Sequence, residues 1–293
     1  MAKIKPKPPG KELDAVTTLG DQKIYVYETE GGPFRRYKDQ HDAVAVGTAR
    51  SATPDSLRKM FQKVSDNVRR RRVFKYDGCT AAIAHLSTDD TLLTAHLGDS
   101  RVTLFVESHA TGTMTAHQLT KDHDAKNASE RRRVLSMEGG FIDKYNYFMN
   151  GNKKHLGSIQ ISRAFGCRIL APYITDEPEI STYRLSGFAG PQDRVFLCID
   201  CDGAREWTGP AARGKILREW DKASSQNPAR LLAEKAVADG STDNVSVILA
   251  ELSPFRHKNL MLPVFDGFGD KGNKASQHVA KLVKKQMTYA AKL

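Results

Sequence analysis

The sequence has little cysteine and no long uninterrupted apolar segment. Its 293 residues include four cysteines, and so few thiols are typical of a reducing compartment. No stretch approaches the roughly 18 uncharged apolar residues of a membrane-spanning helix. Residues 1–10 are rich in lysine and proline and lack an apolar centre, so they predict neither a secretory signal nor a transit peptide. These absences argue against secretion and favour an intracellular protein, cytoplasmic or attached to a cytoskeletal or other large complex.

Two of the cysteines, Cys198 and Cys201, form a C-x-x-C pair. Such a pair can bind zinc or take part in redox chemistry, but a zinc site needs a second pair of ligands, and none is evident. Cys198 lies in the apolar run 195–199, where a free cysteine behaves as a small buried hydrophobic side chain. We therefore expect both thiols to be structural.

The charge is predominantly of one sign. There are 45 Lys and Arg residues against 34 Asp and Glu, a formal net charge of +11. This excess favours an acidic partner, such as a nucleic acid or an acidic protein surface. The most basic runs are 69–72, 131–133 and 281–285, and no nucleic-acid-binding motif accompanies them. Solvated helix faces are the simpler interpretation, and nucleic-acid binding stays open as an alternative.

With 40% apolar and 27% charged residues, the composition is that of a globular protein with a sizeable core. We divide the chain into an extended basic tail, 1–20, a main domain, 21–253, and a C-terminal unit, 254–293. The C-terminal unit is expected to be a loop followed by an amphipathic, lysine-rich helix. The apolar stripe of this helix docks either on the main domain or on a protein partner. The stripe consists of Val279, Leu282, Val283 and Met287.

Hydrophobic periodicity predicts an alternation of short strands and amphipathic helices. Helices are expected where apolar residues recur every three to four positions, and strands where they alternate or run together between turns. The expected helices are 55–71, 128–137, 210–220 and 228–238, and the expected strands are 24–28, 42–46, 80–86, 91–96, 101–106, 158–162, 194–200 and 245–252.

Acidic residues at strand ends are candidate metal ligands: Asp99, Asp202, Glu206 and Asp243. Asp202 ends an apolar strand and precedes Gly203, which lets the chain turn so that a carboxylate and a backbone carbonyl face one ion. Hard cations such as Mg²⁺ and Mn²⁺ prefer these oxygen ligands. An isolated acid in such a position is more often a turn residue or a cap, so no single residue decides between the two interpretations.

The succession of short motifs is more specific. In order along the chain come Thr80-Ala81, Gly98-Asp99-Ser100-Arg101, Leu119-Thr120-Lys121-Asp122-His123, Gly139-Gly140, Ser162-Arg163-Ala164-Phe165-Gly166, Pro178-Glu179, Asp202-Gly203 and Gly240-Ser241-Thr242-Asp243-Asn244. This succession resembles the type-2C protein phosphatase family over roughly residues 77–252. The resemblance implies an α+β fold, with two antiparallel β-sheets packed as a sandwich and flanked by helices. It also implies two divalent ions, Mg²⁺ or Mn²⁺, that clamp the phosphate of phosphoserine or phosphothreonine and lower the pKa of an attacking water.

The resemblance also assigns roles to individual residues. Asp202, with Gly203, and Asp243 fall on metal-binding positions, and Glu206 falls where the family has a further aspartate. Asp42 matches the last acid of the family's N-terminal Arg-x-x-x-Glu-Asp motif, and His41 stands in place of its glutamate. The phosphate-binding arginine falls at Tyr37, or at Arg36 with a one-residue slip.

The family has an Asp-Gly-His-Gly-Gly segment after this motif, whose aspartate bridges both metals and whose glycine carbonyl adds a ligand. No such segment lies between Asp42 and the helix expected at 55–71. Cys167 stands where the family has an aspartate linked to a third, weaker metal, and a thiol is a poor ligand for Mg²⁺ or Mn²⁺. Without a bridging carboxylate, two dications close together repel strongly.

The sequence therefore predicts a catalytically impaired, phosphatase-like domain that serves as a structural or interaction subunit of a larger assembly. The alternative is an active Mg²⁺- or Mn²⁺-dependent phosphatase with an altered metal site, which acts on a phosphoprotein.

Overall fold

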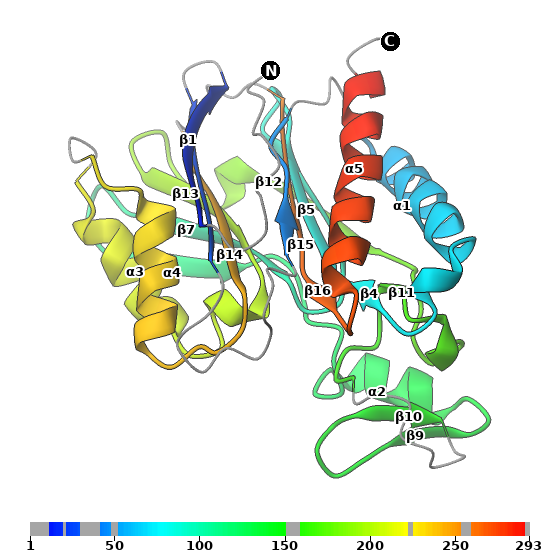
Figure 1. Ribbon diagram of the computed structural model, residues 1–293. Coiled ribbons are helices and arrows are strands. Elements are labelled where there is room, and N and C mark those ends of the chain that lie inside the picture. Colours follow the sequence, from blue (N-terminus) through cyan, green and yellow to red (C-terminus); the bar gives the residue numbers. More distant parts are fainter. Residues whose placement is uncertain are drawn as a thin grey trace.

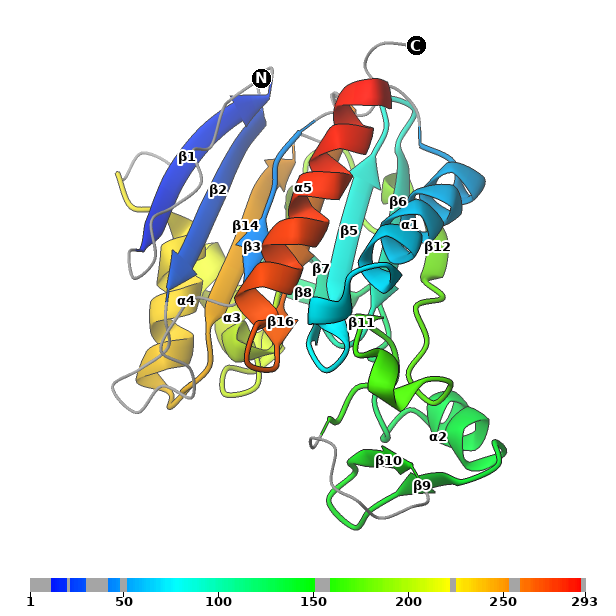
Figure 2. The same cartoon turned by 45° about the vertical axis from the view of Figure 1, so that its right-hand side comes forward.

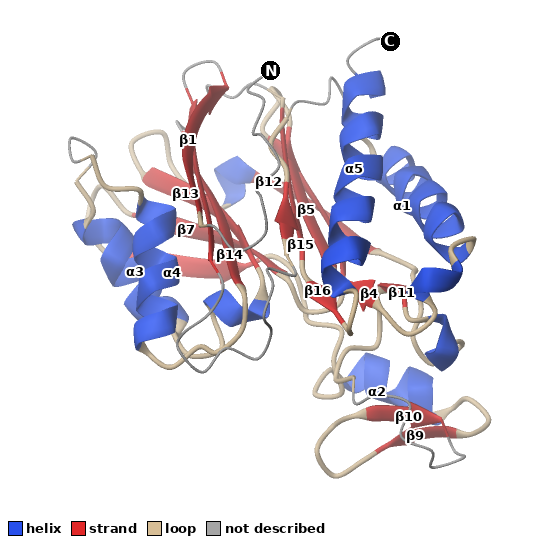
Figure 3. Cartoon of the chain, viewed as in Figure 1, coloured by secondary structure: helices blue, strands red, loops and turns tan. Residues whose placement is uncertain are grey.

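A computed structural model of the chain describes residues 12–19, 22–29, 42–47, 52–150, 159–221, 225–252 and 259–290. Two large sheets pack face to face, and helices cover the outer side of each (Figures 1 and 3). The α+β sandwich predicted from the sequence is confirmed. None of the described helices is long and apolar enough to cross a membrane. The helices are α1 (Pro54–Arg69), α2 (Ala128–Leu135), α3 (Pro210–Glu219), α4 (Pro228–Ala238) and α5 (Gly272–Ala290).

Every strand pair in the two large sheets is antiparallel. The six-stranded sheet has the order β1 (Leu13–Leu19), β2 (Gln22–Thr29), β14 (Val245–Leu252), β13 (Arg194–Asp200), β7 (Arg101–Glu107) and β8 (Met114–Gln118). The five-stranded sheet has the order β12 (Glu179–Arg184), β6 (Thr91–Leu97), β5 (Ala81–Leu86), β15 (Leu260–Phe265) and β3 (Ala43–Val44). Smaller sheets join β11 (Phe165–Gly166), β4 (Gly78–Cys79) and β16 (Gly267–Phe268), and pair β9 (Gly140–Ile142) with β10 (Phe148–Asn150).

Alternation along the strands sends apolar side chains to both faces of each sheet. One face packs against the other sheet, as Val26 of β2 and Leu262 of β15 do in the central core. The opposite faces pack under α1 and α5 on one side, and under α3 and α4 on the other. Because both faces are buried, the central strands are nearly continuous apolar runs rather than alternating ones.

The expected helices 55–71, 128–137, 210–220 and 228–238 are confirmed to within a few residues. Local signals explain their starts, since Thr53 caps α1 in a reciprocal hydrogen-bond pair with Ser56 and Asn227 caps α4. The strand expected at 158–162 is wrong in its described part, where Ile159 and Ile161 form only isolated bridges.

The N-terminal segment is more ordered than predicted. Residues 13–19 were expected in an extended tail, but they form β1, the edge strand next to β2. Asp14 of β1 accepts a hydrogen bond from Asn227 Nδ2 at 2.7 Å, which ties the strand to the start of α4. This segment extends the six-stranded sheet by one strand.

The C-terminal unit is part of the core. Strand β15 lies between β5 and β3, and α5 lies beside α1 over the same sheet (Figure 2). Val279, Val283 and Met287 are buried there and Leu282 is partly buried, so the proposal that this stripe binds a partner is wrong. The stripe is apolar because it packs on the chain's own five-stranded sheet.

Pro263 explains why β15 was mistaken for a loop. A proline lacks a backbone N–H and argues against a central strand. In the structure the Pro263 carbonyl accepts a hydrogen bond from the Ala45 N–H at 3.1 Å, so this residue faces β3. The backbone N–H that Pro263 lacks would therefore point towards β3. Because β3 has only two residues, few hydrogen bonds between strands are lost.

Candidate metal centre

One edge of the six-stranded sheet brings three of the expected acids together. The last residue of β13, Asp200, is paired with Arg101 at the start of β7 and with Val247 near the start of β14. Asp99 lies just before β7 and Asp202 just after β13. Asp243, in the loop before β14, reaches the same edge because β14 runs antiparallel to β13.

The five-stranded sheet adds two acids at the facing end. Phe265, the last residue of β15, is paired with Ala43 of β3. Asp266 therefore follows β15 at the point where Asp42 precedes β3. A carboxylate oxygen of each and the Cys201 Sγ lie within 4.8 Å of one another. Asp266, which was not among the predicted site residues, thus joins Asp42 from a distant part of the sequence.

Asp266 is the electrostatic centre of the group. Burial raises its pKa well above the usual range, and the charges of Asp42, Asp202, Asp243 and Asp99 raise it further. Four like charges act on one carboxyl, so an ionised cluster needs cations to be stable. The main chain of Asp266 is fixed by Thr80, whose N–H donates to the Asp266 carbonyl at 2.8 Å.

The Asp42 side chain fits a metal-binding role. It is 4% exposed, and its carboxylate oxygens form no hydrogen bond of ordinary geometry with the described residues, although Asp266, Ser246 and Cys201 lie close enough to lower its pKa. Burial raises its pKa to about 6, and the charge of Asp202 contributes. Buried carboxylates without donors are costly unless a cation coordinates them, and clustered carboxylate oxygens suit Mg²⁺ or Mn²⁺.

Asp99 shows the same crowding. Burial and the Asp202 charge raise its pKa to about 8, although Arg205 opposes this shift. Gly98 allows the turn that presents Asp99, with φ at +84° and no room for a Cβ, which would lie 2.7 Å from Thr80 Cγ2. The three strand-end acids and the two acids of the five-stranded sheet therefore form one centre.

Cys201 lies within the cluster but is unsuited to a hard cation. Its thiol donates to the Asn244 carbonyl at 3.3 Å, and its sulfur accepts from the Ser246 N–H at 3.2 Å. Burial raises the pKa of this thiol well above its usual value, and neighbouring carboxylates raise it further. Cys201, like Cys198, is buried and free, as expected of a structural cysteine.

Gly203 allows two ligand-bearing loops to touch. A Cβ on Gly203 would lie 2.1 Å from the Asn244 carbonyl oxygen. Its own carbonyl, a predicted metal ligand, accepts a hydrogen bond from Ser241 Oγ at 2.8 Å. That bond joins the loop of Asp202 to the loop of Asp243 and fixes their separation.

A cavity of about 510 Å³ opens beside the cluster. Asp99 and Asp202 form part of its wall, and Glu206 and Trp207 are exposed next to them. Trp207 is 55% exposed, whereas Trp220 is buried. Arg36, the predicted phosphate-binding residue, lies outside the described residues.

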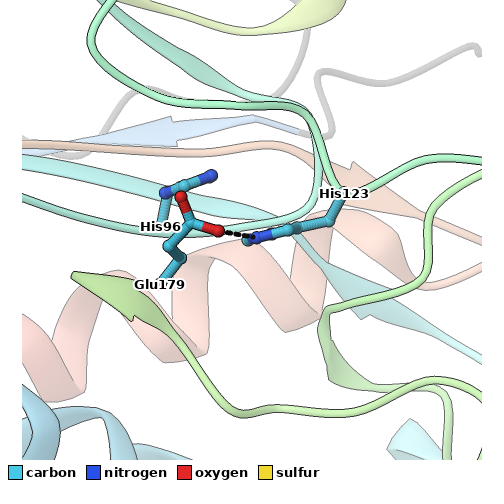
Figure 4. Close-up of side chains that lie close together, drawn as sticks. All are labelled: His96, His123 and Glu179. Atoms are coloured by element: carbon cyan, nitrogen blue, oxygen red, sulfur yellow. Dashed lines mark hydrogen bonds and ion pairs between the residues drawn. The ribbon is translucent and has the colours of Figure 1, made fainter. Parts of the chain in front are cut away.

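A second group of possible metal ligands, His96, His123 and Glu179, does not fit a metal (Figure 4). The two imidazole rings are stacked with centroids 4.3 Å apart and planes 7° apart, so their in-plane lone pairs cannot converge on one ion. His123 Nδ1 accepts from the Gly98 N–H at 3.2 Å, which leaves Nε2–H to face Glu179 at 3.4 Å. His123 thus holds the Gly98 turn that presents Asp99, which is a structural role.

Comparison with known proteins identifies the family. The family model described as "Protein phosphatase 2C" matches residues 31–245. The chain belongs to the protein phosphatase 2C family. A relative named "Probable protein phosphatase 2C 2" from Arabidopsis thaliana is 28% identical over 256 residues, 82% of this chain and 63% of that protein. The "Protein kinase and PP2C-like domain-containing protein" of the same plant is 34% identical over 66% of this chain, which spans 27% of its length.

Solved structures of similar fold agree with this assignment. The serine-threonine phosphatase 2C from Toxoplasma gondii has a TM-score of 0.65 at 18% identity, with 82% of this chain and 99% of that chain covered. A sex determining protein of C. elegans has a TM-score of 0.58 at 19% identity, with 94% and 64% covered. The family match ends at residue 245, before Asp266.

Residues 266–269 read Asp266-Gly267-Phe268-Gly269 after an apolar strand. They are similar to the first four positions of the family's Asp-Gly-His-Gly-Gly segment, with Phe in place of His. The signal in the sequence is the apolar run 260–265 directly before an Asp-Gly pair. This pair was not among the predicted site residues because it stands far from Asp42 in the sequence.

Cys167 lies away from this centre. It is buried in a separate apolar cluster, and burial and then the charge of Asp77 raise its thiol pKa to about 12. Its N–H donates to the Asp77 carbonyl at 2.9 Å. The Cys167 side chain therefore serves packing in this cluster, which also contains Ala164 and Leu170.

Proposed function

We propose that the chain is an active Mg²⁺- or Mn²⁺-dependent phosphatase that acts on phosphoserine or phosphothreonine in proteins. The observation that carries this proposal is Asp266 beside Asp42, facing the strand-end acids. It removes the main reason for expecting an impaired enzyme, because the bridging acid that seemed lost has a counterpart in space.

The protein's own residues prepare the site for cations. Asp42, Asp202, Asp243 and Asp266 supply carboxylate oxygens, and Gly267 supplies the carbonyl of the family motif. Bound divalent ions would polarise the phosphate and lower the pKa of an attacking water. Thr80 orients Asp266 by the Thr80 N–H bond to its carbonyl, and Thr80 Oγ1 lies 2.6 Å from Ser100 Oγ, next to Asp99.

An impaired binding subunit remains the competing proposal. Its support is the identity of two residues, His41 in place of the family's glutamate and Tyr37 in place of its arginine. The chain also spans 27% to 63% of the length of these first two relatives, so substrates and partners of whole relatives are not transferred. Measured turnover distinguishes the two proposals.

The test is hydrolysis of a phosphothreonine peptide with Mn²⁺, with Mg²⁺, and with a chelator. We expect turnover that needs the metal, and a loss of about 100-fold or more in Asp266→Asn because one ligand of the cluster is removed. The matched control is Asp270→Asn, an exposed acid in the same segment, which should keep wild-type activity. Without metal, Asp266→Asn should melt at a higher temperature than wild type, since a repelling charge is gone.

Two results would count against the proposal. If wild type binds Mn²⁺ but hydrolyses no phosphopeptide, the impaired interpretation stands. If Asp266→Asn and Asp270→Asn are equally active, Asp266 is not a ligand and the spatial match to the family segment has no functional meaning.

A further inference from the structure

Arg205 is one of two arginines that are buried in the described part of the chain, the other being Arg213. The Arg205 side chain is 6% exposed, and its Nε–H has no partner among the described residues. The Nε–H of Arg213 also lacks a partner there, but a terminal nitrogen of Arg213 donates to Asp200. The ion pair of Arg205 joins a terminal nitrogen to Asp122 Oδ2 at 3.8 Å, which is too long for a hydrogen bond. The less buried Arg101 donates two bonds of 2.7 and 2.6 Å to the same Asp122.

The location of Arg205 points to a ligand. It follows Asp202-Gly203-Ala204 and lines the cavity together with Asp99, Asp202 and Glu206. A buried guanidinium has five donors, and leaving them unused costs free energy. An anion in the cavity would use them, and a phosphate offers oxygens that match the planar guanidinium fork.

We propose that Arg205 binds the phosphoryl group of the substrate at the inner wall of this cavity. The inference rests on the proposed function, because a phosphate enters a wall of carboxylates only when divalent cations neutralise them. With cations at Asp202 and its neighbours, the local charge becomes positive and Arg205 adds a directional contact. Arg205 is then a substrate-binding residue next to Asp99 and Asp202 in the cavity wall.

A different role for Arg205 is that of a counterion. The charges of Asp99, Asp122, Asp200 and Asp202 all act on it and hold its pKa above the usual value. A counterion role would explain the charge but not the long Asp122 contact, since Arg213, the other buried arginine of the described residues, donates a hydrogen bond to its counterion Asp200. The two roles make opposite predictions for metal binding and phosphate binding.

The experiment is calorimetric titration of inorganic phosphate into the Mn²⁺-loaded protein, with a separate titration of Mn²⁺. Arg205→Met should weaken phosphate binding by about 10-fold or more, since hydrogen bonds from a charged group are lost. Arg205→Lys keeps the charge but not the planar guanidinium fork, so its phosphate affinity should lie between those of wild type and Arg205→Met. If the methionine variant does not fold, the lysine variant provides the test. The matched control is Lys126→Met, which removes the same charge from the same cavity and should change phosphate binding by less than about 2-fold.

The outcomes are separable. Phosphate binding unchanged in Arg205→Met, with tighter Mn²⁺ binding, overturns the proposal and makes Arg205 a counterion. An equal loss in Lys126→Met also overturns it, because general charge then explains the effect. Absence of phosphate binding to the Mn²⁺-loaded wild type overturns it directly. If wild type binds Mn²⁺ and phosphate as expected but hydrolyses no peptide, the proposed enzyme function fails while the role of Arg205 stands.

Discussion

The two large sheets contribute to the metal centre in different ways. The six-stranded sheet supplies Asp99, Asp202 and Asp243 from neighbouring strands, in the chain order of the family. The five-stranded sheet supplies Asp42 and Asp266 from opposite ends of the chain, on strands that pair directly. A strand joins an antiparallel sheet by backbone hydrogen bonds to its neighbour and is covered by a packed layer, so it can come from any part of the chain. Chain order is therefore a weaker guide to this site than strand pairing.

The largest expected effect tests whether the late segment belongs to the core. Val279→Asp places a charge where the side chain is 0% exposed under the five-stranded sheet, and it should lower the free energy of unfolding by about 4 kcal/mol or more. Urea unfolding measures this. Lys281→Asp, an exposed position on the same helix, should change stability by less than about 0.5 kcal/mol. Equal stability of the two variants would mean that the packing of α5 on the five-stranded sheet does not stabilise the fold.

The next prediction concerns how stability depends on pH. It contrasts an acid paired with arginines, Glu130, with the crowded acids of the metal centre. Burial alone would raise the pKa of Glu130, but hydrogen bonds from Arg163, Ser162 and Arg133 outweigh it and lower the pKa to about 2. A lowered pKa stabilises the fold above the unfolded value of about 4.5, and this contribution is lost as pH falls towards 2.

We therefore expect wild type to lose about 3 kcal/mol across that range from this group. Glu130→Gln should be less stable at neutral pH and should show a flatter profile between pH 4.5 and 2. Urea midpoints measured across this pH range test it, and a variant profile as steep as that of wild type would contradict it.

A second pH effect compares histidines of the two sheets. Burial, and then the charge of His123, lower the pKa of His96 on β6 to about 4. A lowered histidine pKa means that the fold keeps the ring neutral, so stability falls as pH falls from about 6.5 to 4, by about 3 kcal/mol at most.

His96→Gln should remove this slope when thermal midpoints are measured from pH 7 to 4. His117→Gln, a half-buried histidine on β8 of the other sheet, should leave it. If His117→Gln flattens the profile instead, the pH response belongs to the six-stranded sheet.

Sequence reasoning found most of the six-stranded half. The apolar runs of β13 and β14 and the turns at Gly98 and Gly203 carry strong local signals, and their acids follow directly. Reasoning failed for β15, because Pro263 and the nearby glycines are typical of a loop. The helix α5 was predicted, but its apolar stripe left open which surface buries it, and the structure shows that this surface is the chain's own five-stranded sheet.

The sequence by itself determined the family, the sandwich fold and three strand-end acids, because these depend on local patterns of polarity and turns. Only the tertiary structure brings Asp266 beside Asp42 and places Arg205 in the wall of the cavity. Both depend on contacts between residues far apart in the chain, which periodicity and motif order do not encode. The pairing of Phe265 with Ala43, made by backbone hydrogen bonds and covered by α5, is the physical link between the last strand of the chain and the first acid of the site.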